Sequence, residues 1–137
     1  MSIDARQQAV LLKDAGILDH FGMEFIRAEQ GVCEMEATVK PELINAAGLA
    51  HGGLLFALAD TACAYAVGSL GTRGATINAN MTYVHAATAG QHLVGKAEVV
   101  NRSRRLVSLR AEVVTGGADS RLLAHGTFVF MLIEQEV

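Results

Sequence analysis

The sequence predicts an α+β fold in which an antiparallel β-sheet covers one long helix. Residues 52–70 form a helical segment with hardly any polar face, and a helix that is apolar all round is buried. Two short strand-like segments precede this helix, and four longer ones follow it. Strands grouped in this way are typical of an antiparallel sheet, against which the helix buries its surface.

The part of the chain before the helix is predicted to hold two short helical segments and two strands. Residues 5–15 indicate a short amphipathic helix, and residues 17–22 indicate a turn or a brief helix. Strands are expected at residues 24–29 and 32–40. The Glu-Gln-Gly segment at 29–31 is the expected turn between them.

The buried helix has recognisable start and stop signals. It is rich in alanine, which favours helix, and it contains no proline. Gly52 and Gly53 open it, and Gly68 and Gly71 are the expected stop signals. We therefore expect one uninterrupted helix in the core.

The second half of the chain is predicted to be β-structure. Turns are expected at the polar run Asn101–Arg104 and at Gly116–Gly117. The four expected strands are residues 75–84, 91–101, 105–115 and 121–133. The length of 137 residues fits one domain, which we expect to be residues 1–137.

Composition excludes several classes of protein. The chain is 51% hydrophobic and 18% charged, and part of this apolar excess is expected at a subunit interface. The net charge of −3 argues against general nucleic-acid binding. No apolar run is long enough for a membrane-spanning helix, and the first residues lack the layout of a signal peptide. We therefore expect a cytoplasmic protein with no nucleic-acid or membrane partner.

Cysteine and histidine usage indicates neither a disulfide nor a metal site. Cys33 falls in a predicted strand and Cys63 in the buried helix, where both are expected to be small core residues in a reducing compartment. The five histidines show no metal-ligand spacing. We expect no metal and no cofactor.

The most informative segment runs from Asn45 to Asp60. An ionised carboxylate is costly in an apolar helix, so Asp60 has a partner from elsewhere, faces a cavity or interface, or lies at a solvent edge. Gly52 and Gly53 either form a simple turn between the loop and the helix, or they form a site where backbone N–H groups bind a phosphate or an oxyanion. His51 before them is either a base or a structural residue that hydrogen-bonds the loop.

The order and length of these elements resemble the hotdog fold, in which a curved antiparallel sheet wraps around one long central helix. Within that fold, Asn45, the His-Gly-Gly turn at 51–53 and the segment 56–60 are similar to the PaaI-like acyl-CoA thioesterases. The resemblance covers roughly residues 20–134. It implies hydrolysis of the thioester of an acyl- or aryl-acyl-CoA to the free acid and CoA.

The resemblance also implies a role for each residue of the motif. Asp60 is the catalytic carboxylate, acting as nucleophile or as general base on a water. The Gly52 N–H binds the thioester carbonyl, and Asn45 positions that carbonyl or the attacking water. Thr76 holds the same water or is an ordinary strand residue. His51 belongs to the same catalytic group.

Family members form dimers in which the two central helices meet side by side. Each active site then joins Gly52 of one chain to Asp60 of the other. By resemblance, we expect this chain to self-associate as a homodimer or homotetramer with its active site at the dimer interface. This arrangement also predicts a face of small residues at Ala59, Ala62 and Ala66.

The phosphates of CoA require a basic region near the mouth of the site, and arginine suits phosphate because its planar fork makes two hydrogen bonds. Arg102, Arg104 and Arg105 correspond to the region where the family binds the nucleotide; a solvated turn is the alternative. His85 stands where the family more often has proline, serine or arginine, and it is a further expected contact.

The acyl pocket is expected to be lined by Gly53, Leu54, Leu58 and Tyr65. Nothing polar there selects a particular acyl group, although the resemblance favours aryl-acetyl or hydroxylated aryl groups, as in phenylacetate metabolism. Two other functions remain open: a non-catalytic acyl-CoA sensor or assembly module, and a hotdog hydratase or dehydratase. The intact Asn45, Gly52 and Asp60 argue against the first. The missing His-Phe-Pro-rich loop argues against a dehydratase.

Overall fold

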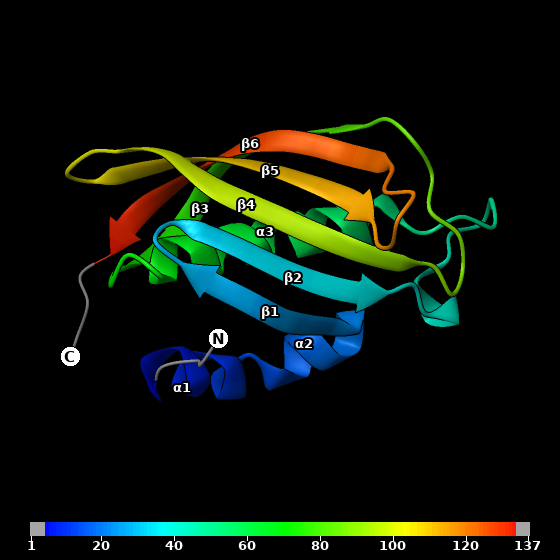
Figure 1. The fold of residues 1–137 in the computed structure, drawn as a ribbon, viewed down its shortest axis with the longest axis horizontal. Helices are drawn as coiled ribbons and strands as arrows, with labels where there is room; N and C mark the ends of the chain where they lie inside the picture. The colour runs from blue at the N-terminus through cyan, green and yellow to red at the C-terminus, as the bar shows by residue number, and fades with distance from the viewer. Residues whose placement is uncertain (1–4, 134–137) are drawn as a thin grey trace.

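The computed structural model describes residues 5–133, which fold into an antiparallel sheet and a long helix beneath it (Figure 1). The predicted domain also includes residues 1–4 and 134–137, which lie outside the described residues. The elements are α1 (Ala5–Lys13), α2 (Ala15–Phe21), β1 (Met23–Glu29), β2 (Val32–Thr38), the 3₁₀ helix η1 (Pro41–Leu43), α3 (Gly52–Gly68), β3 (Arg73–Tyr83), β4 (His92–Arg102), β5 (Leu106–Thr115) and β6 (Leu122–Ile133). No helix within residues 5–133 is long and apolar enough to cross a membrane.

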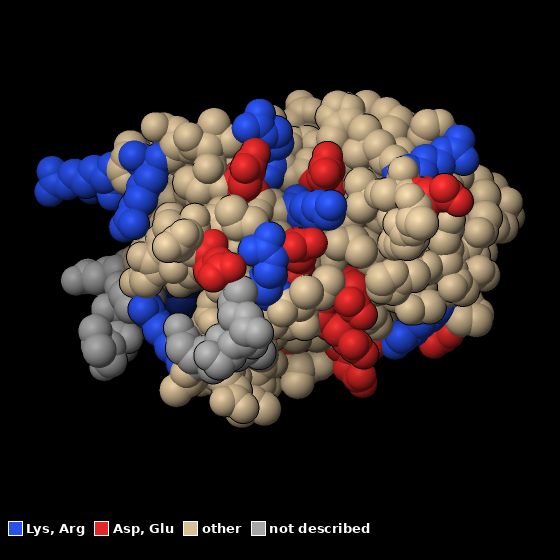
Figure 2. Space-filling model, in the orientation of Figure 1, with Lys and Arg blue, Asp and Glu red and all other residues tan. Residues whose placement is uncertain are grey.

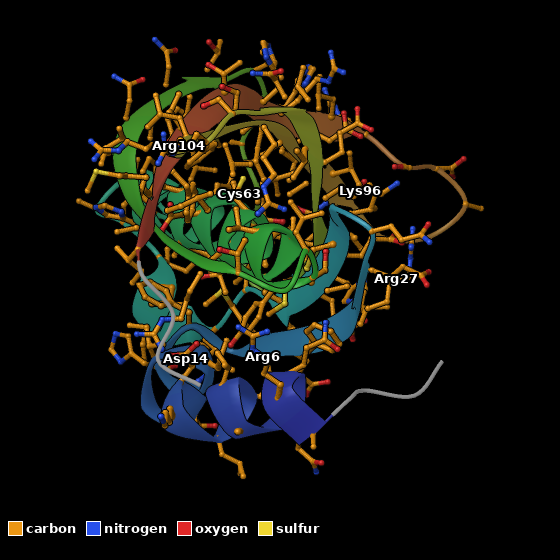
Figure 3. All side chains as sticks on the ribbon, turned by 90° about the vertical axis from the view of Figure 1, so that its left-hand side faces the viewer. Arg6, Asp14, Arg27, Cys63, Lys96 and Arg104 are labelled. Atoms are coloured by element: carbon orange, nitrogen blue, oxygen red, sulfur yellow. The ribbon has the colours of Figure 1, made fainter. Side chains whose placement is uncertain are left out.

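The six strands form one sheet in the order β1-β2-β4-β5-β6-β3, and every neighbouring pair is antiparallel. Seen from its end, the sheet curves around α3 (Figure 3). This arrangement confirms the predicted hotdog architecture of a curved antiparallel sheet around one central helix.

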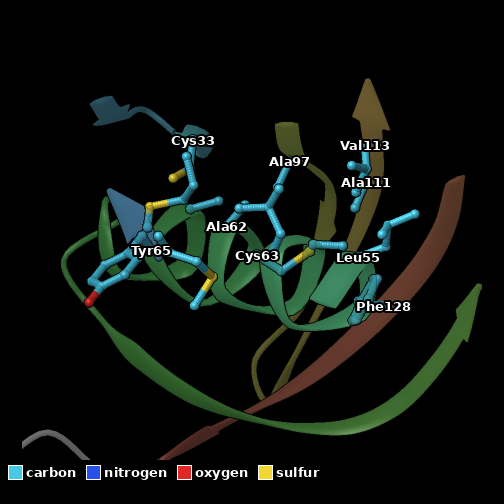
Figure 4. Packing of buried hydrophobic residues seen from close by; sticks show 14 of the residues in the cluster. Cys33, Leu55, Ala62, Cys63, Tyr65, Ala97, Ala111, Val113 and Phe128 are labelled. Atoms are coloured by element: carbon cyan, nitrogen blue, oxygen red, sulfur yellow. The ribbon is translucent and has the colours of Figure 1, made fainter. Parts of the chain in front are cut away.

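Small side chains let α3 lie close to the sheet. A side chain at Gly95 of β4 would place its Cβ 2.7 Å from Leu58 Cγ, so glycine is required for this approach. Ala59, Ala62 and Ala66 are fully buried against the chain's own core. The prediction that these alanines form an interface between two helices is therefore wrong. Figure 4 shows Ala62 of α3 and Ala97 of β4 in this buried core.

The two cysteines are free thiols in this core. Cys33 of β2 and Cys63 of α3 are both buried, as Figure 4 shows. Among the described residues, no group of three or more His, Cys, Asp or Glu side chains is placed to hold a metal ion.

The turn between β1 and β2 forms at the predicted position. Gln30 and Gly31 have φ angles of 49° and 81°, and Gln30 is the one non-glycine residue with positive φ among residues 5–133. The Gly31 N–H donates to Ser69 Oγ just after α3, at 2.8 Å. Val99 N–H of β4 donates to the Gly31 carbonyl at 2.8 Å. The β1–β2 turn and this part of β4 therefore lie at the C-terminal end of α3.

The two edges of the sheet differ. At the β1 edge, Gln7 Nε2 of α1 donates to the Ala28 carbonyl at 3.1 Å, and α1 and α2 lie alongside β1 (Figure 1). The Tyr65 hydroxyl of α3 also donates to Asp14 Oδ2, between α1 and α2, at 2.7 Å. At the other edge, β3 pairs with β6, and no second strand of the described chain pairs with it. The sheet thus has one covered edge and one open edge.

The outer face of the sheet carries charges of both signs, which interleave over the face shown in Figure 2. The strand register places Arg27 beside Glu34, and Arg27 Nε donates to Glu34 Oε2 at 2.6 Å. On the next two strands, Lys96 of β4 lies opposite Glu34 of β2, and Glu112 of β5 lies opposite Lys96. These neighbours of opposite charge are typical of a solvated face.

Candidate active site

Asp60 and Thr76 form a pair on α3 and β3. The Thr76 Oγ1 hydroxyl donates a hydrogen bond of 2.7 Å to Asp60 Oδ1. Burial raises the pKa of the half-buried Asp60 above its ordinary value, and the hydrogen bond from Thr76 opposes that rise. The Asp60 carboxylate is therefore more basic than a surface aspartate, which suits a group that takes a proton from water.

The N-terminus of α3 leaves the Gly52 N–H without an acceptor among the described residues. His51 is the N-cap residue, and its Nδ1 accepts the Gly53 N–H at 2.8 Å. The His51 carbonyl accepts the Leu54 N–H at 2.9 Å. Within the part of the chain that the structure describes, the Gly52 N–H donates to no acceptor. Because Nδ1 of His51 accepts a hydrogen bond, the proton of its neutral imidazole is on Nε2.

A side chain would clash at Gly53 but not at Gly52. A Cβ at Gly53 would lie 2.8 Å from His51 Nδ1, so the N-cap hydrogen bond needs glycine there. A Cβ at Gly52 would lie 3.6 Å from the Tyr83 ring, which is an ordinary contact distance. Packing therefore does not require glycine at 52. Because Gly52 has no side chain, a ligand can approach its free N–H closely.

Replacing Gly53 by alanine is expected to lower the free energy of unfolding by about 1 kcal/mol, because the methyl group displaces the His51 cap. Gly52→Ala is the matched control, since both changes gain the same helix propensity and only the first disturbs the cap. Thermal unfolding of the two variants checks this difference. Equal Tm values would show that the cap contributes nothing.

A cavity of about 300 Å³ lies beside the free Gly52 N–H. Asn45, Tyr83 and His85 supply its polar side chains, Gly52 supplies its backbone N–H, and side chains such as Leu49, Leu55 and Val84 make its apolar wall. Tyr83, the last residue of β3, was not singled out from the sequence. The signal that could have found it is an aromatic residue at the end of a strand, two positions before His85.

The side-chain oxygen of Asn45 is already hydrogen-bonded within its own loop. Its Oδ1 accepts the backbone N–H groups of Ala47 at 2.9 Å and Leu49 at 3.1 Å, which holds the loop before α3 in place. The Nδ2 group is left as a donor of two hydrogen bonds. Asn45 can therefore contact a carbonyl oxygen or the lone pair of a water at the cavity.

His85 has a fixed orientation at the same cavity. Its Nδ1 lies 3.0 Å from the Leu122 carbonyl oxygen. A carbonyl only accepts hydrogen bonds, so Nδ1 carries the proton and Nε2 of the neutral ring is an acceptor. His51 and His85 therefore have opposite tautomers.

The three large side chains expected in the acyl pocket lie elsewhere in the fold. Leu54 and Leu58 are buried in the core, with exposed fractions of 1% and 0%. Tyr65 points toward the N-terminal helices, where its hydroxyl reaches Asp14. None of the three lines the cavity beside Gly52, whose apolar wall includes Leu49 and Leu55.

Arg102, Arg104 and Arg105 are exposed in and beside the β4–β5 hairpin. This hairpin lies near the C-terminal end of α3, because the neighbouring Val99 contacts the β1–β2 turn there. Figure 2 shows basic side chains projecting at that end, and Figure 3 shows Arg104 facing the viewer from it. Within residues 5–133, none of the three arginines is in an ion pair. In one chain, they lie at the opposite end of α3 from Gly52.

Comparison with known proteins identifies the family. The family model described as "Thioesterase superfamily" matches residues 47–120. The acyl-coenzyme A thioesterase PaaI of Escherichia coli K12 is 30% identical over 105 residues, which are 77% of this chain and 75% of that protein.

Solved structures agree with this result. A variant of the phenylacetic acid degradation protein PaaI from Thermus thermophilus matches with a TM-score of 0.80 and 30% identity, covering 86% of this chain and 99% of that one. A hypothetical thioesterase protein of Streptococcus pneumoniae TIGR4, solved with coenzyme A, matches with a TM-score of 0.78 and 26% identity, covering 84% and 91%. The chain therefore belongs to the thioesterase superfamily, as a PaaI-like thioester hydrolase with the hotdog fold.

Proposed function

We propose that the protein hydrolyses acyl-CoA thioesters at a site that combines Gly52 of one protomer with Asp60 of another. The observation that carries this proposal is the free Gly52 N–H, which opens onto a cavity at a position where packing does not require glycine. A helix N-terminus with a free N–H stabilises the oxyanion that forms when a thioester carbonyl is attacked.

Two routes use the same groups. With Asp60 as general base, the carboxylate takes a proton from water while the water oxygen adds to the carbonyl carbon. The oxyanion, held by the Gly52 N–H, then collapses and expels the CoA thiolate, which takes up the proton. With Asp60 as nucleophile, the carboxylate itself displaces the thiolate, and water hydrolyses the resulting mixed anhydride. Either route yields the free acid and CoA.

Thr76 and Asn45 hold the reacting groups in this proposal. Thr76 fixes the Asp60 carboxylate through Oδ1, and the Asn45 Nδ2 group donates to the thioester carbonyl or to the water. Solved variants of the Streptococcus pneumoniae protein replace one aspartate or one threonine by alanine. Those two residues lie as far apart in that sequence as Asp60 and Thr76 do in this one, which supports the pairing.

One chain cannot supply both groups to one thioester. Gly52 and Asp60 are separated by about 12 Å along the helix axis, since each residue adds about 1.5 Å. A carbonyl that accepts the Gly52 N–H therefore lies out of reach of Asp60 in the same chain. A second copy must supply the carboxylate.

The surface of the chain supports such a pairing. The β3 edge, which carries no charged residue after Arg73, leaves its backbone groups open, and Ile77 on it is 53% exposed. Next to this edge, the less buried stripe of α3 consists mainly of small residues, which let two helices approach closely. These residues are Gly53, Ala57, Thr61, Ala64 and Gly68.

Complementation tests this arrangement. Asp60→Asn and Gly52→Pro protomers, each inactive alone, are unfolded together, refolded as a mixture and assayed. Half of the dimers are then mixed, and each mixed dimer has one intact site and one doubly altered site. We expect about a quarter of the wild-type activity to return. No recovery in a mixture that forms dimers would place both groups in one chain.

The direct test of the function is thioester hydrolysis by the purified protein, followed through the thiol that is released. We expect turnover of acyl-CoA esters, with phenylacetyl-CoA or a hydroxylated aryl-acyl-CoA among the best. The name of the Thermus thermophilus relative, a phenylacetic acid degradation protein, supports the aryl-acyl class. Absence of turnover with aryl and alkyl esters alike would contradict the proposal.

The nucleotide of CoA is proposed to contact the hairpin arginines of the partner chain. When two α3 helices lie antiparallel, the C-terminal end of one is beside the N-terminal end of the other. Replacing Arg102 and Arg104 by alanine should then raise the KM for acyl-CoA about tenfold, because each of the two solvent-exposed charge contacts contributes at most about 1 kcal/mol.

A thioester of pantetheine alone is the comparison substrate, and its KM should remain unchanged. Arg110→Ala is the matched control, because Arg110 pairs with Glu98 on the outer face at 3.1 Å. An equal rise in KM for both substrates would show that the arginines do not contact the nucleotide.

A further inference from the structure

Tyr83 lies directly over the first turn of α3. Two of its ring atoms, Cε1 and Cζ, are 3.6 and 3.7 Å from the position that a Cβ at Gly52 would occupy. The strand register fixes this placement, since β3 ends at Tyr83 opposite Ala124 of β6. The ring therefore stands beside the donor that would hold the thioester carbonyl.

The Tyr83 side chain has a free face and a free hydroxyl. It is 48% exposed, although one side of the ring lies against the helix. Burial raises the pKa of Tyr83, so the phenol remains neutral at physiological pH. Within the described residues the Tyr83 hydroxyl takes part in no hydrogen bond. A half-exposed aromatic face at the wall of a cavity is available to a ligand.

The neighbouring wall indicates which part of the substrate lies there. The pantetheine arm of CoA carries amide groups, which need hydrogen-bond partners when they leave water. The wall has an apolar side at Leu49, Leu55 and Val84 and a polar side at Asn45 and His85. The apolar side therefore fits an acyl group better than the pantetheine arm, and the polar side is left for the thioester carbonyl. The volume of about 300 Å³ accommodates a single ring.

We propose that Tyr83 is a specificity-determining residue whose ring forms the wall of the acyl cavity, and that it favours acyl groups bearing a flat ring over straight alkyl chains. This inference rests on the proposed thioesterase function. Aromatic rings attract each other in offset or edge-to-face arrangements, and an alkyl chain of similar size lacks this attraction.

The test compares Tyr83→Leu and Tyr83→Phe with the wild type, on phenylacetyl-CoA and hexanoyl-CoA. Leucine keeps an apolar side chain without the ring, and phenylalanine keeps the ring without the hydroxyl. We expect Tyr83→Leu to lower the ratio of kcat/KM for phenylacetyl-CoA to that for hexanoyl-CoA about three- to tenfold. Tyr83→Phe should keep the wild-type ratio. Thermal unfolding without ligand verifies that each variant is folded.

Binding is measured in parallel, through the rise in Tm that each ester produces. A wild type that hydrolyses neither ester contradicts the proposed function. The inference about Tyr83 still holds in that case if phenylacetyl-CoA raises Tm more than hexanoyl-CoA does and Tyr83→Leu removes the difference. An unchanged ratio and an unchanged Tm difference in Tyr83→Leu would overturn it. An equal loss in Tyr83→Phe would overturn it too, because the hydroxyl and not the ring would then be responsible.

Discussion

Replacing Asp60 by asparagine is expected to lower kcat by about 10² to 10⁴, the range that a positioned acid or base contributes. Asparagine has the same shape and still accepts the Thr76 hydrogen bond through its carbonyl oxygen, so the local structure is retained. It cannot take a proton from water or form a mixed anhydride. The measurement is single-substrate kinetics with phenylacetyl-CoA. Asp119→Asn, in the exposed turn before β6, is the matched control.

The same variant should be more stable than the wild type at neutral pH. Burial raises the pKa of Asp60, so an unfolded chain loses this proton at a lower pH than the folded protein does. The free energy of unfolding therefore falls as pH rises from the ordinary carboxyl pKa to the raised one, and the full penalty applies above that window. Asparagine carries no such penalty.

Thermal unfolding at a series of pH values checks this expectation. The Tm of Asp60→Asn should exceed that of the wild type above the window and approach it below the ordinary carboxyl pKa. Normal turnover by folded Asp60→Asn would show that Asp60 takes no part in the reaction. If Asp60→Asn instead had a lower Tm than the wild type at neutral pH, hydrogen bonds or charges in the folded state would outweigh the cost of burying the ionised carboxylate.

Replacing Gly52 by proline is expected to lower kcat by about 10² to 10³, as the loss of one oxyanion donor does. Proline removes the N–H, which has no acceptor in the described structure and is dispensable for the first position of a helix. His51 before it has φ −61° and ψ 136°, an extended conformation that suits a residue preceding proline. The helix should therefore still form.

Gly52→Ala is the control for this change. It keeps the N–H and adds a methyl group at an ordinary contact distance from Tyr83. We expect alanine to lower kcat less than proline does, because alanine keeps the donor and only narrows the approach to it, with circular dichroism unchanged in both. Equal kcat values for the two variants would show that the Gly52 N–H does not take part in the reaction.

Most element boundaries could be predicted from the sequence, because glycines and strand patterns mark them. The helix expected at residues 52–70 is α3 at Gly52–Gly68. The four strands after it begin and end within two residues of the expected positions. The Glu-Gln-Gly turn was also predictable, because glycine adopts the positive φ that such a turn requires.

The faces of α3 could not be predicted, because the helix is apolar all round. Sequence periodicity therefore could not show that Ala59, Ala62 and Ala66 face the sheet while Ala57 and Ala64 face outward. The resemblance to PaaI-like enzymes selected Thr76, and the structure places its hydroxyl on Asp60. Tyr83 escaped detection because its position over Gly52 depends on where β3 ends relative to the start of α3.

The unequal edges of the sheet limit how copies of this chain can associate. The β1 edge is covered by α1, where Gln7 binds the Ala28 carbonyl, whereas β3 leaves its outer edge open. An edge that pairs with an identical edge around a two-fold axis is used up once the pair has formed. Strand addition through β3 would therefore stop at two copies. Because α1 covers the β1 edge, no further copy can add there to form a longer strand-to-strand polymer.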